Sequence, residues 1–182
     1  MNKRKALIMD RDGTLIEDKN YAYKIEDFEL FPGVIDGLKL LQNEFLFFIV
    51  TNQSGIGRGY YTTEDFHKFN NHLINTLKRE KIEIIKTYFC LHLKEDNCEC
   101  RKPKTKFIDM INDEFNIDLN ESFVVGDHPS DIEFGINAGC KTIFLTTGHG
   151  YKHLDNLKSL GIKPTIICDN FLGAAKEILK IL

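Results

Sequence analysis

Short apolar runs recur along the whole chain and alternate with longer amphipathic segments. The runs are apolar at nearly every position, whereas a strand with one face in water alternates apolar and polar residues. They therefore predict strands that are covered on both faces of a sheet. We expect these strands at residues 6–9, 45–50, 84–89, 123–125, 142–145 and 165–168.

Apolar residues between these runs recur three and four positions apart, which is the period of an amphipathic helix. One such pattern follows Pro32-Gly33, and another follows Thr62-Thr63, a pair suited to cap the first turn of a helix. Further helices are expected around residues 107–115, at residues 129–138 and in the tail after Asp169. Strands that alternate with helices predict an α/β fold with a doubly wound, Rossmann-like parallel sheet of about six strands.

Composition and charge narrow the class of protein. The chain has 182 residues, of which 42% are apolar and 28% charged, and it shows no repeat or linker, so we expect one globular domain over residues 1–182. The net charge is −3, which argues against a general affinity for nucleic acid or an anionic membrane. The longest apolar run, residues 45–50, is far shorter than the roughly 20 residues of a membrane helix. The basic start of the chain runs into Asp10 without the apolar stretch of a signal peptide, so we expect a cytoplasmic protein.

Two carboxylates follow the first predicted strand directly. Asp10 and Asp12 lie two residues apart in the stretch DRDGT, and Gly13 allows the chain to turn sharply out of the strand. Negative charge at the end of a buried strand is costly unless a cation compensates it. Mg²⁺ prefers oxygen ligands and leaves coordination sites for phosphate, so the pair predicts a magnesium site. A solvated acidic turn is the simpler alternative.

Groups suited to bind phosphate follow the second and third strands. The residues after the second strand offer a hydroxyl, side-chain amides and main-chain N–H groups, although ordinary loops have a similar composition. These residues are Thr51, Asn52, Gln53 and Ser54. The neighbouring cations Arg101 and Lys102 suit a phosphate dianion, unless they form only an exposed basic pair.

Two more carboxylates follow the fourth strand. Asp127 is expected at the same edge of the sheet as Asp10, and we interpret it as a Mg²⁺ ligand. Asp131 is a weaker candidate, because an acidic residue in the first turn of a helix is favoured by the helix dipole alone. In parallel sheets the ligand site lies beyond the carboxyl ends of the strands, so all these groups are expected to meet there.

Taken in order along the chain, these residues resemble the four motifs of the phosphatases in the haloacid dehalogenase (HAD) superfamily. The resemblance covers nearly the whole chain, and residues 10–14 are its most specific part. It implies that Asp10 is a nucleophile that forms an aspartyl-phosphate and that Asp12 is first a general acid and then a base for the hydrolytic water. It also implies that Thr51 and Lys102 stabilise the phosphate and that Asp10, Asp12 and Asp127 bind Mg²⁺. The segments between the motifs are too short for a cap domain, so an open site is expected.

Three of the five cysteines lie close together with one histidine. This set comprises Cys90, His92, Cys98 and Cys100. Its Cys₃His composition is that of a closed structural zinc site, and the polar residues within it predict a loop over about residues 90–102 rather than free thiols in the core. Cys140 and Cys168 lie in or next to predicted strands and are expected to be small buried side chains.

A zinc loop that runs directly into Arg101-Lys102 resembles two groups of HAD phosphatases, which act on heptose 1,7-bisphosphate and on histidinol phosphate. The stretch NQSGIGRG after Thr51 is similar to the heptose group, because the histidinol group typically has an Asp where Ser54 stands. The resemblance therefore implies removal of the 7-phosphate of D-glycero-D-manno-heptose 1,7-bisphosphate, within nucleotide-heptose synthesis for lipopolysaccharide or another glycoconjugate. Histidinol-phosphate phosphatase is the alternative.

The same resemblance implies a set of substrate contacts. They are Asp18, Lys19, Asn20, Tyr21, Thr51, Asn52, Gln53, Ser54, Arg101 and Lys102. The chain departs from the group at His128, where Lys or Arg is usual, and we interpret His128 as a solvent-facing residue at the start of a helix. The expected partner is a small sugar bisphosphate, bound by a monomer. A receiver-like signalling module is an alternative of another class, which Asp12 argues against because a receiver needs a long-lived aspartyl-phosphate.

Overall fold

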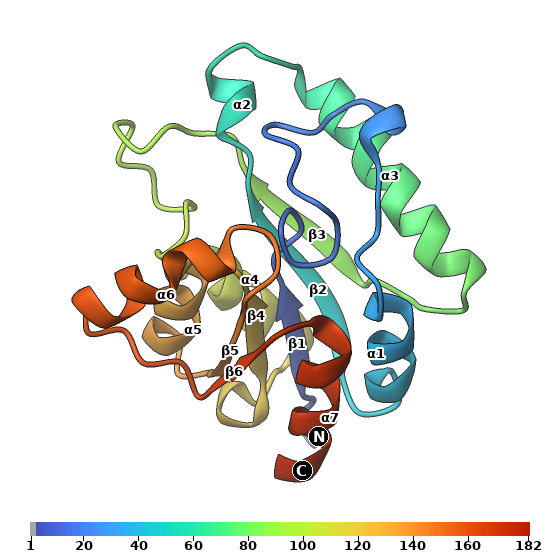
Figure 1. Cartoon of the computed structure of the whole chain (residues 1–182), viewed down its shortest axis with the longest axis vertical. Helices are drawn as coiled ribbons and strands as arrows, with labels where there is room; N and C mark the ends of the chain where they lie inside the picture. Colours follow the sequence, from blue (N-terminus) through green and yellow to red (C-terminus); the bar gives the residue numbers. More distant parts are fainter. Residues whose placement is uncertain (1–2) are drawn as a thin grey trace.

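The computed structural model describes residues 3–182 and contains a six-stranded parallel sheet. The strands are β1 (Ala6–Met9), β2 (Leu46–Asn52), β3 (Lys86–Cys90), β4 (Phe123–Gly126), β5 (Lys141–Leu145) and β6 (Ile166–Cys168). Their order across the sheet is β3-β2-β1-β4-β5-β6 (Figure 1). All six strands predicted from the apolar runs are confirmed, with small differences at their ends.

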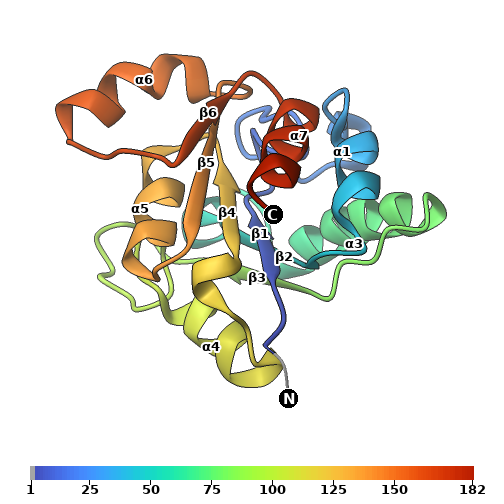
Figure 2. The same ribbon diagram turned by 90° about the horizontal axis from the view of Figure 1, so that it is seen from below.

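Helices cover both faces of this sheet. They are α1 (Val34–Leu41), α2 (Ser54–Gly57), α3 (Thr63–Arg79), α4 (Lys106–Phe115), α5 (Pro129–Asn137), α6 (Gly150–Ser159) and α7 (Phe171–Ile181). Helices α1, α3 and α7 lie on one face, whereas α4 and α5 lie on the other (Figure 2). Helix α6 was not predicted, because it buries only Gly150 and Leu157 and so leaves a weak apolar pattern.

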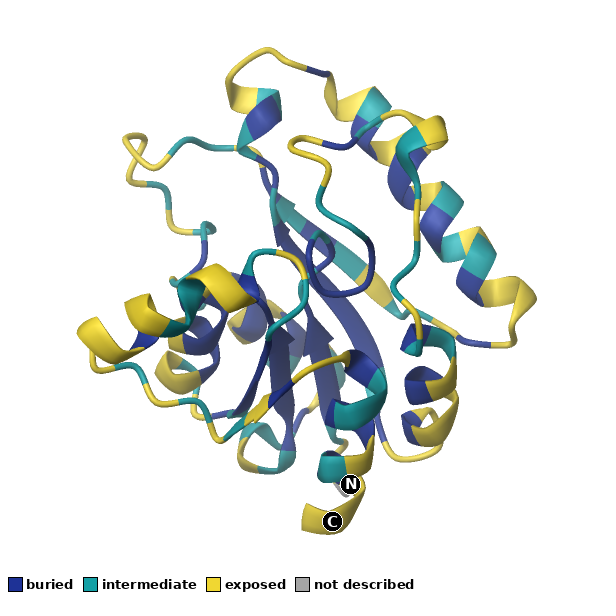
Figure 3. Ribbon diagram, viewed as in Figure 1, coloured by how far each residue is buried: buried dark blue, intermediate teal, exposed yellow. Residues whose placement is uncertain are grey.

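The core explains why the strands are apolar at every position. In β1, Leu7 and Met9 pack into the cluster under α1, α3 and α7, whereas Ala6 and Ile8 pack into the cluster under α4 and α5. Figure 3 shows the central strands buried along their length. Cys140 and Cys168 are buried as predicted, and burial raises the pKa of their thiols to about 12 and about 11.

The strand order places a crevice between β1 and β4. The chain runs from β1 outward to β3 and then returns to β4 on the other side of β1, which is the topological switch point of such sheets. Asp10 N donates to Val125 O at 2.9 Å, so the ends of the two strands are held together. The connections from β1 to α1 and from β2 to α3 contain only the single-turn helices η1 (Ile25–Asp27) and α2, so no cap domain covers the crevice in the described chain.

The longest helix of residues 3–182, α3, has 17 residues and one apolar face, and no helix of this part of the chain combines the length and apolarity that crossing a bilayer requires. Its start confirms the predicted cap, because Thr62 is the N-cap residue. Thr62 Oγ1 accepts a hydrogen bond from Asp65 N at 3.1 Å, and Asp65 Oδ2 accepts one from Thr62 N at 2.9 Å. This capping box satisfies two of the N–H groups that a helix start leaves free.

Thr62→Ala removes the cap of α3 and leaves the buried contacts of the helix in place. We expect the free energy of unfolding at pH 7 to fall by about 1 kcal/mol, measured by urea denaturation. The matched control is Thr63→Ala at the first helical position, which should leave the free energy of unfolding unchanged or raise it slightly.

The loss of unfolding free energy in Thr62→Ala should also depend on pH. The hydrogen bonds from Thr62 lower the pKa of Asp65 below its usual range. The hydrogen bonds that the Asp65 carboxylate accepts therefore stabilise the fold above the unfolded-state pKa of Asp65, and this part of the capping box is lost as the pH falls through the folded-state pKa. The difference between wild type and Thr62→Ala should shrink in acid, and a difference that persists in full once Asp65 is protonated would contradict the assignment.

Candidate active site

A buried lysine contacts groups that lie in or shortly after β1, β2 and β4. Lys102 is 5% exposed, and its Nζ lies 2.8 Å from Asp10 Oδ1, 2.7 Å from Asp131 Oδ1 and 2.7 Å from Val50 O. Burial by itself lowers the pKa of Lys102, but the charges of Asp10 and Asp131 outweigh it and the net shift is upward. The side chain is therefore a fixed positive charge at the predicted edge of the sheet.

Asn52 holds the main chain of Lys102 in place. Lys102 N donates to Asn52 Oδ1 at 3.1 Å, and Asn52 Nδ2 donates to Lys102 O at 3.4 Å. The side-chain amide of Asn52, at the end of β2, thus binds the loop that leaves β3. This contact explains how a lysine outside any strand or helix reaches the crevice between β1 and β4.

Three carboxyl groups lie around this lysine, and their combined negative charge when ionised exceeds its single positive charge. One oxygen atom from each of Asp10, Asp127 and Asp131 lies within 4.8 Å of the others. Burial, and then the charges of Asp10 and Asp131, raise the pKa of Asp127 well above its ordinary value. Burial also raises the pKa of Asp10, although Lys102 opposes this shift. Three acids against one ammonium group leave a concentration of negative charge that a divalent cation fits.

Asp127 is held beside Asp10 by hydrogen bonds that point its carboxylate into the crevice. It accepts hydrogen bonds from Thr14 Oγ1 at 3.3 Å and from His149 N at 3.0 Å. A Cβ atom at Gly13 would lie 2.2 Å from Asp127 Oδ2, so this close approach requires glycine. Gly13 also has a φ of +83°, which glycine adopts without strain and which confirms the predicted sharp turn.

Asp131 has a larger part in the site than its position in a first helical turn predicts. Its Oδ2 accepts a hydrogen bond from His128 N at 3.0 Å, as expected for an acid at the start of α5, while its Oδ1 pairs with Lys102. The prediction that Asp131 is an acid in the first turn of a helix is confirmed, but it gives only part of the role of this residue. The proximity of a helix start to the end of β4 was the signal that could have placed it in the site. His128 is exposed and is the N-cap residue of α5, as predicted.

The carboxylate of Asp12 is not part of the acidic cluster. Arg11 Nε and Nη2 donate to its two oxygens at 3.0 and 3.1 Å, and Gln53 Nε2 donates to Oδ2 at 2.7 Å. Gln53 Nε2 also donates to Thr51 Oγ1 at 2.8 Å, and Tyr61 OH donates to Gln53 Oε1 at 2.5 Å. Burial raises the pKa of Tyr61, which keeps its hydroxyl protonated as a donor. Arg11 and Tyr61 were not predicted as site residues.

Two adjoining pockets open over these groups. A pocket of about 170 Å³ is lined by the acidic cluster, Thr51, Arg101, Lys102 and His128, among others. A second pocket of about 270 Å³ shares four lining residues with it, namely Asp12, Asp18, Asn52 and His149. Its remaining walls are Asn20, Tyr21, Ala22, Gln53, Ser54 and Tyr61.

The structure brings nine of the ten predicted substrate contacts to these two pockets. The exception is Lys19, whose Nζ pairs with Glu29 Oε2 at 2.9 Å and which lines neither pocket. His149 was missed, although its place shortly after β5 follows the same rule as the predicted residues. Its Nδ1 lies 3.5 Å from Asp18 Oδ2, so it fixes one wall that the two pockets share.

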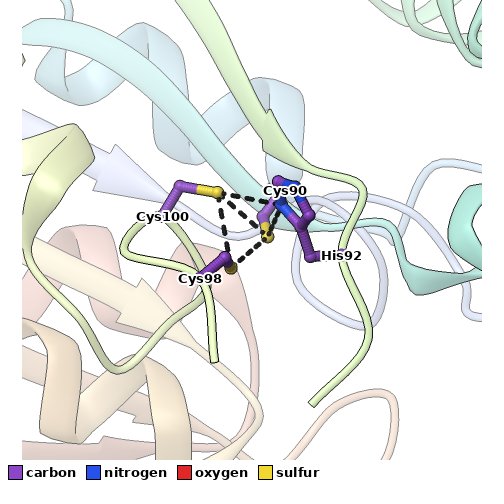
Figure 4. A group of neighbouring side chains, drawn as sticks. All are labelled: Cys90, His92, Cys98 and Cys100. Carbon is purple, nitrogen blue, oxygen red and sulfur yellow. Dashed lines mark hydrogen bonds between the residues drawn. The ribbon is translucent and has the colours of Figure 1, made fainter. Parts of the chain in front are cut away.

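The four predicted zinc ligands converge in the loop after β3 (Figure 4). The Sγ atom of Cys100 lies 3.2 Å from that of Cys90, and Cys90 Sγ lies 3.5 Å from Cys98 Sγ. His92 Nδ1 lies 3.6 Å from Cys90 Sγ and 3.4 Å from Cys100 Sγ. The thiols form no disulfide. Four ligand atoms this close together match the edges of a tetrahedron around a metal ion with metal–sulfur distances of about 2.3 Å.

This loop is bonded to both walls of the site. Arg101 Nη1 donates to His92 O at 3.2 Å, which ties the predicted phosphate-binding arginine to the Cys₃His cluster. Gln53 N donates to Cys90 O at 2.7 Å, and Gly57 N donates to Leu91 O at 3.1 Å. The cluster is therefore placed to fix the position of Arg101 relative to the loop that begins at Gln53.

Comparison with known proteins places the chain among phosphatases. The model of the HAD-hydrolase-like family matches residues 99–174. The D-glycero-alpha-D-manno-heptose-1,7-bisphosphate 7-phosphatase of Campylobacter jejuni is 42% identical over 164 residues, which cover 87% of this chain and 94% of the relative. The D-glycero-beta-D-manno-heptose-1,7-bisphosphate 7-phosphatase of Helicobacter pylori is 42% identical over 147 residues, or 80% of this chain and 85% of the relative.

A solved structure agrees over nearly the full length. The D,D-heptose 1,7-bisphosphate phosphatase of B. bronchiseptica, crystallised with magnesium and phosphate, superposes with a TM-score of 0.88 and 27% identity, covering 98% of this chain and 99% of that one. The sheet order, the acidic cluster at the switch point and these likenesses agree with one another. The chain therefore belongs to the HAD-like hydrolases, in the family of the D-glycero-D-manno-heptose-1,7-bisphosphate 7-phosphatases.

Proposed function

We propose that this protein is a Mg²⁺-dependent phosphomonoesterase that removes the 7-phosphate of D-glycero-D-manno-heptose 1,7-bisphosphate in the cytoplasmic synthesis of nucleotide-activated heptose. The observation that carries the proposal is the Lys102 ammonium group, bound between Asp10 and Asp131 with Asp127 alongside. This arrangement sets a nucleophilic carboxylate, a phosphate-binding cation and a cation site at the end of one crevice. The names of the relatives supply the substrate class.

Asp10 is the proposed nucleophile, because it lines the smaller pocket, contacts Lys102 and lies in the acidic cluster. One of its oxygens attacks phosphorus as the ester bond to the sugar oxygen breaks, which forms an aspartyl-phosphate. Water then attacks the same phosphorus and releases Asp10. Splitting the hydrolysis into two in-line transfers replaces one difficult step by two easier ones. Lys102 and Thr51 line the same pocket and would stabilise charge on the phosphate oxygens, where such stabilisation contributes most.

Mg²⁺ fits the acidic cluster, because three carboxylates there face a single ammonium group. Asp10 and Asp127 would hold the ion with their side chains, which agrees with the prediction for these two residues. The carboxylate of Asp12 is bound by Arg11 and Gln53, so its place among the Mg²⁺ ligands stays a prediction. Bound Mg²⁺ would supply the positive charge that the phosphate dianion and the carboxylates together require.

Zinc is the metal ion that we propose for the Cys₃His cluster. Four closely spaced ligand atoms leave no open position for a catalytic water, so the role is structural. The loop from residue 91 to residue 105 contains no helix or strand and depends on such a crosslink for its shape. The contact between Arg101 and His92 O transmits that shape to the phosphate-binding side of the site.

The two adjoining pockets suit a phosphorylated sugar. The smaller pocket surrounds the acidic cluster and would take the phosphate that is removed, whereas the larger pocket offers hydroxyl, amide and aromatic groups that suit a polyol chain. All of these groups come from one chain, and the monomeric state of the enzyme stays a prediction. The open mouth of the site, without a cap domain, leaves specificity to these loops.

Asp10→Asn should abolish turnover and leave the fold intact, because an amide cannot form the acyl phosphate. We expect phosphate release from heptose 1,7-bisphosphate to fall to below about 10⁻³ of the wild-type kcat. The matched control is Asp36→Asn, an exposed residue of α1, which should keep full activity. Appreciable phosphate release by Asp10→Asn, with unchanged circular dichroism, would refute the nucleophile assignment.

Metal analysis of the purified protein should give about one zinc per chain. Cys98→Ser and Cys100→Ser should each lose this zinc, because three ligands hold a structural ion far less tightly than four. Cys140→Ser is the matched control, since Cys140 is buried elsewhere in the fold, and it should retain the metal. The native protein purified without any zinc would rule the site out.

The substrate is tested by phosphate release with Mg²⁺ from the two anomers of heptose 1,7-bisphosphate and from histidinol phosphate in parallel. We expect kcat/KM for one heptose anomer to exceed that for histidinol phosphate by at least about 10², because the larger pocket offers polar groups for several hydroxyls. A preference for histidinol phosphate would leave the chemistry in place and overturn the substrate.

A further inference from the structure

Arg11 is a buried cation beside the active site to which the reaction above gives no role. It stands between Asp10 and Asp12 in the sequence, is 1% exposed and lines neither of the two pockets. Its guanidinium carbon lies 5.1 Å from the ring centre of Phe66 and 5.0 Å from that of Phe69, both on α3. A charge in such surroundings requires a close counter-ion.

The counter-ion is Asp12. Arg11 Nε lies 3.0 Å from Asp12 Oδ2, and Nη2 lies 3.1 Å from Oδ1, so the guanidinium meets both carboxylate oxygens in a forked arrangement. A forked pair of this kind sets the plane of the carboxylate as well as its position. Arg11 Nη1 has no hydrogen-bond partner within residues 3–182, so the polar contacts that orient the guanidinium are those to Asp12.

Gln53 gives Asp12 a second fixed contact. Its Nε2 donates to Asp12 Oδ2 at 2.7 Å, and its own orientation is set by the hydroxyls of Tyr61 and Thr51. A chain of hydrogen bonds therefore runs from Tyr61 through Gln53 to Asp12, which Arg11 holds from the other side. Rotation of the Asp12 carboxylate would break contacts to both neighbours.

We propose that Arg11, together with Gln53, is a positioning residue that orients the Asp12 carboxyl group for proton transfer in both steps of the hydrolysis. The inference rests on the proposed function, in which Asp12 is the general acid and base. Proton transfer requires the two oxygens to lie within hydrogen-bond reach, so a freely rotating carboxyl group is in the reactive orientation only part of the time.

The role of Asp12 follows from the bonds that change. As Asp10 bonds to phosphorus and the ester bond breaks, protonated Asp12 gives its proton to the departing sugar oxygen. The resulting carboxylate then takes a proton from water as the water oxygen bonds to phosphorus and the bond to Asp10 breaks. Arg11 and Gln53 gain and lose no proton in either step, and they hold the same carboxyl group for both.

The test compares two small esters that differ in the basicity of the leaving oxygen, phenyl phosphate and p-nitrophenyl phosphate, with Mg²⁺ and the intact protein. Nitrophenolate leaves without a proton, whereas phenolate is helped by a general acid. Arg11→Lys keeps the charge and loses the fork. We expect it to lower kcat/KM for phenyl phosphate by about 10-fold or more and for p-nitrophenyl phosphate by less than about 3-fold. Asp12→Asn should change the ratio of the two kcat/KM values in the same direction and by a larger factor.

Phe69→Leu is the matched control, because it loosens the packing around Arg11 and leaves the ion pair to Asp12 in place. It should lower the melting temperature without changing the ratio of the two kcat/KM values. An unchanged ratio in folded Arg11→Lys would overturn the inference, because the positive charge or the packing of Arg11 would then explain its role without the forked contact. If Arg11→Lys does not fold, the ratio of the two kcat/KM values is measured in Gln53→Leu instead. The comparison is valid because both esters bind in the same pocket.

The outcomes separate this inference from the proposed function. A wild-type protein that hydrolyses the aryl esters but not heptose 1,7-bisphosphate would contradict the proposed substrate, and the ratio in the variants would still decide the role of Arg11. A wild-type protein that hydrolyses neither class of ester, with Mg²⁺ and zinc present, would overturn both.

Discussion

The ammonium group of Lys102 is the interaction on which the arrangement of the site depends. It lies at 2.7 to 2.8 Å from two carboxylates and a main-chain carbonyl, where water contributes little. Removal of that charge would leave Asp10, Asp127 and Asp131 in mutual repulsion at the end of a buried sheet. With it, the cluster is still negative, and the proposed divalent cation would neutralise this remaining charge and would also attract phosphate.

A lysine in a loop must be held as firmly as one in a strand to serve this purpose. The amide of Asn52 binds its main chain at both N and O, and the Cys₃His cluster lies in the loop just before it, where the proposed zinc would crosslink the chain. A loop of this size has too small a core of its own to be rigid, and a metal crosslink is the usual remedy in small structures. The same loop is hydrogen-bonded to the residues after β2, so the proposed crosslink would position two walls of the site.

Asp10 and Asp12 lie two residues apart and occupy different environments. Asp10 faces Lys102 and the acidic cluster, whereas Asp12 faces Arg11 and Gln53. Each carboxylate thus has its own cation, and the two are kept apart although their positions in the sequence are nearly the same. Such a separation is what allows two acids in one site to serve as nucleophile and as proton-transfer group.

The sequence by itself determined the six strands, the helices with a clear apolar face and the position of the site, because buried strands and amphipathic helices leave periodic patterns and parallel strands end at one edge. It also predicted Asp10, Asp127, Lys102 and the four metal-ligand candidates, which the structure brings together in two clusters. Only the tertiary structure decided which charges pair: Asp131 joins the acidic cluster, Asp12 leaves it for Arg11, and Lys19 turns to Glu29. These pairings depend on separations of a few ångströms between side chains distant in sequence, and no pattern along the chain encodes such separations.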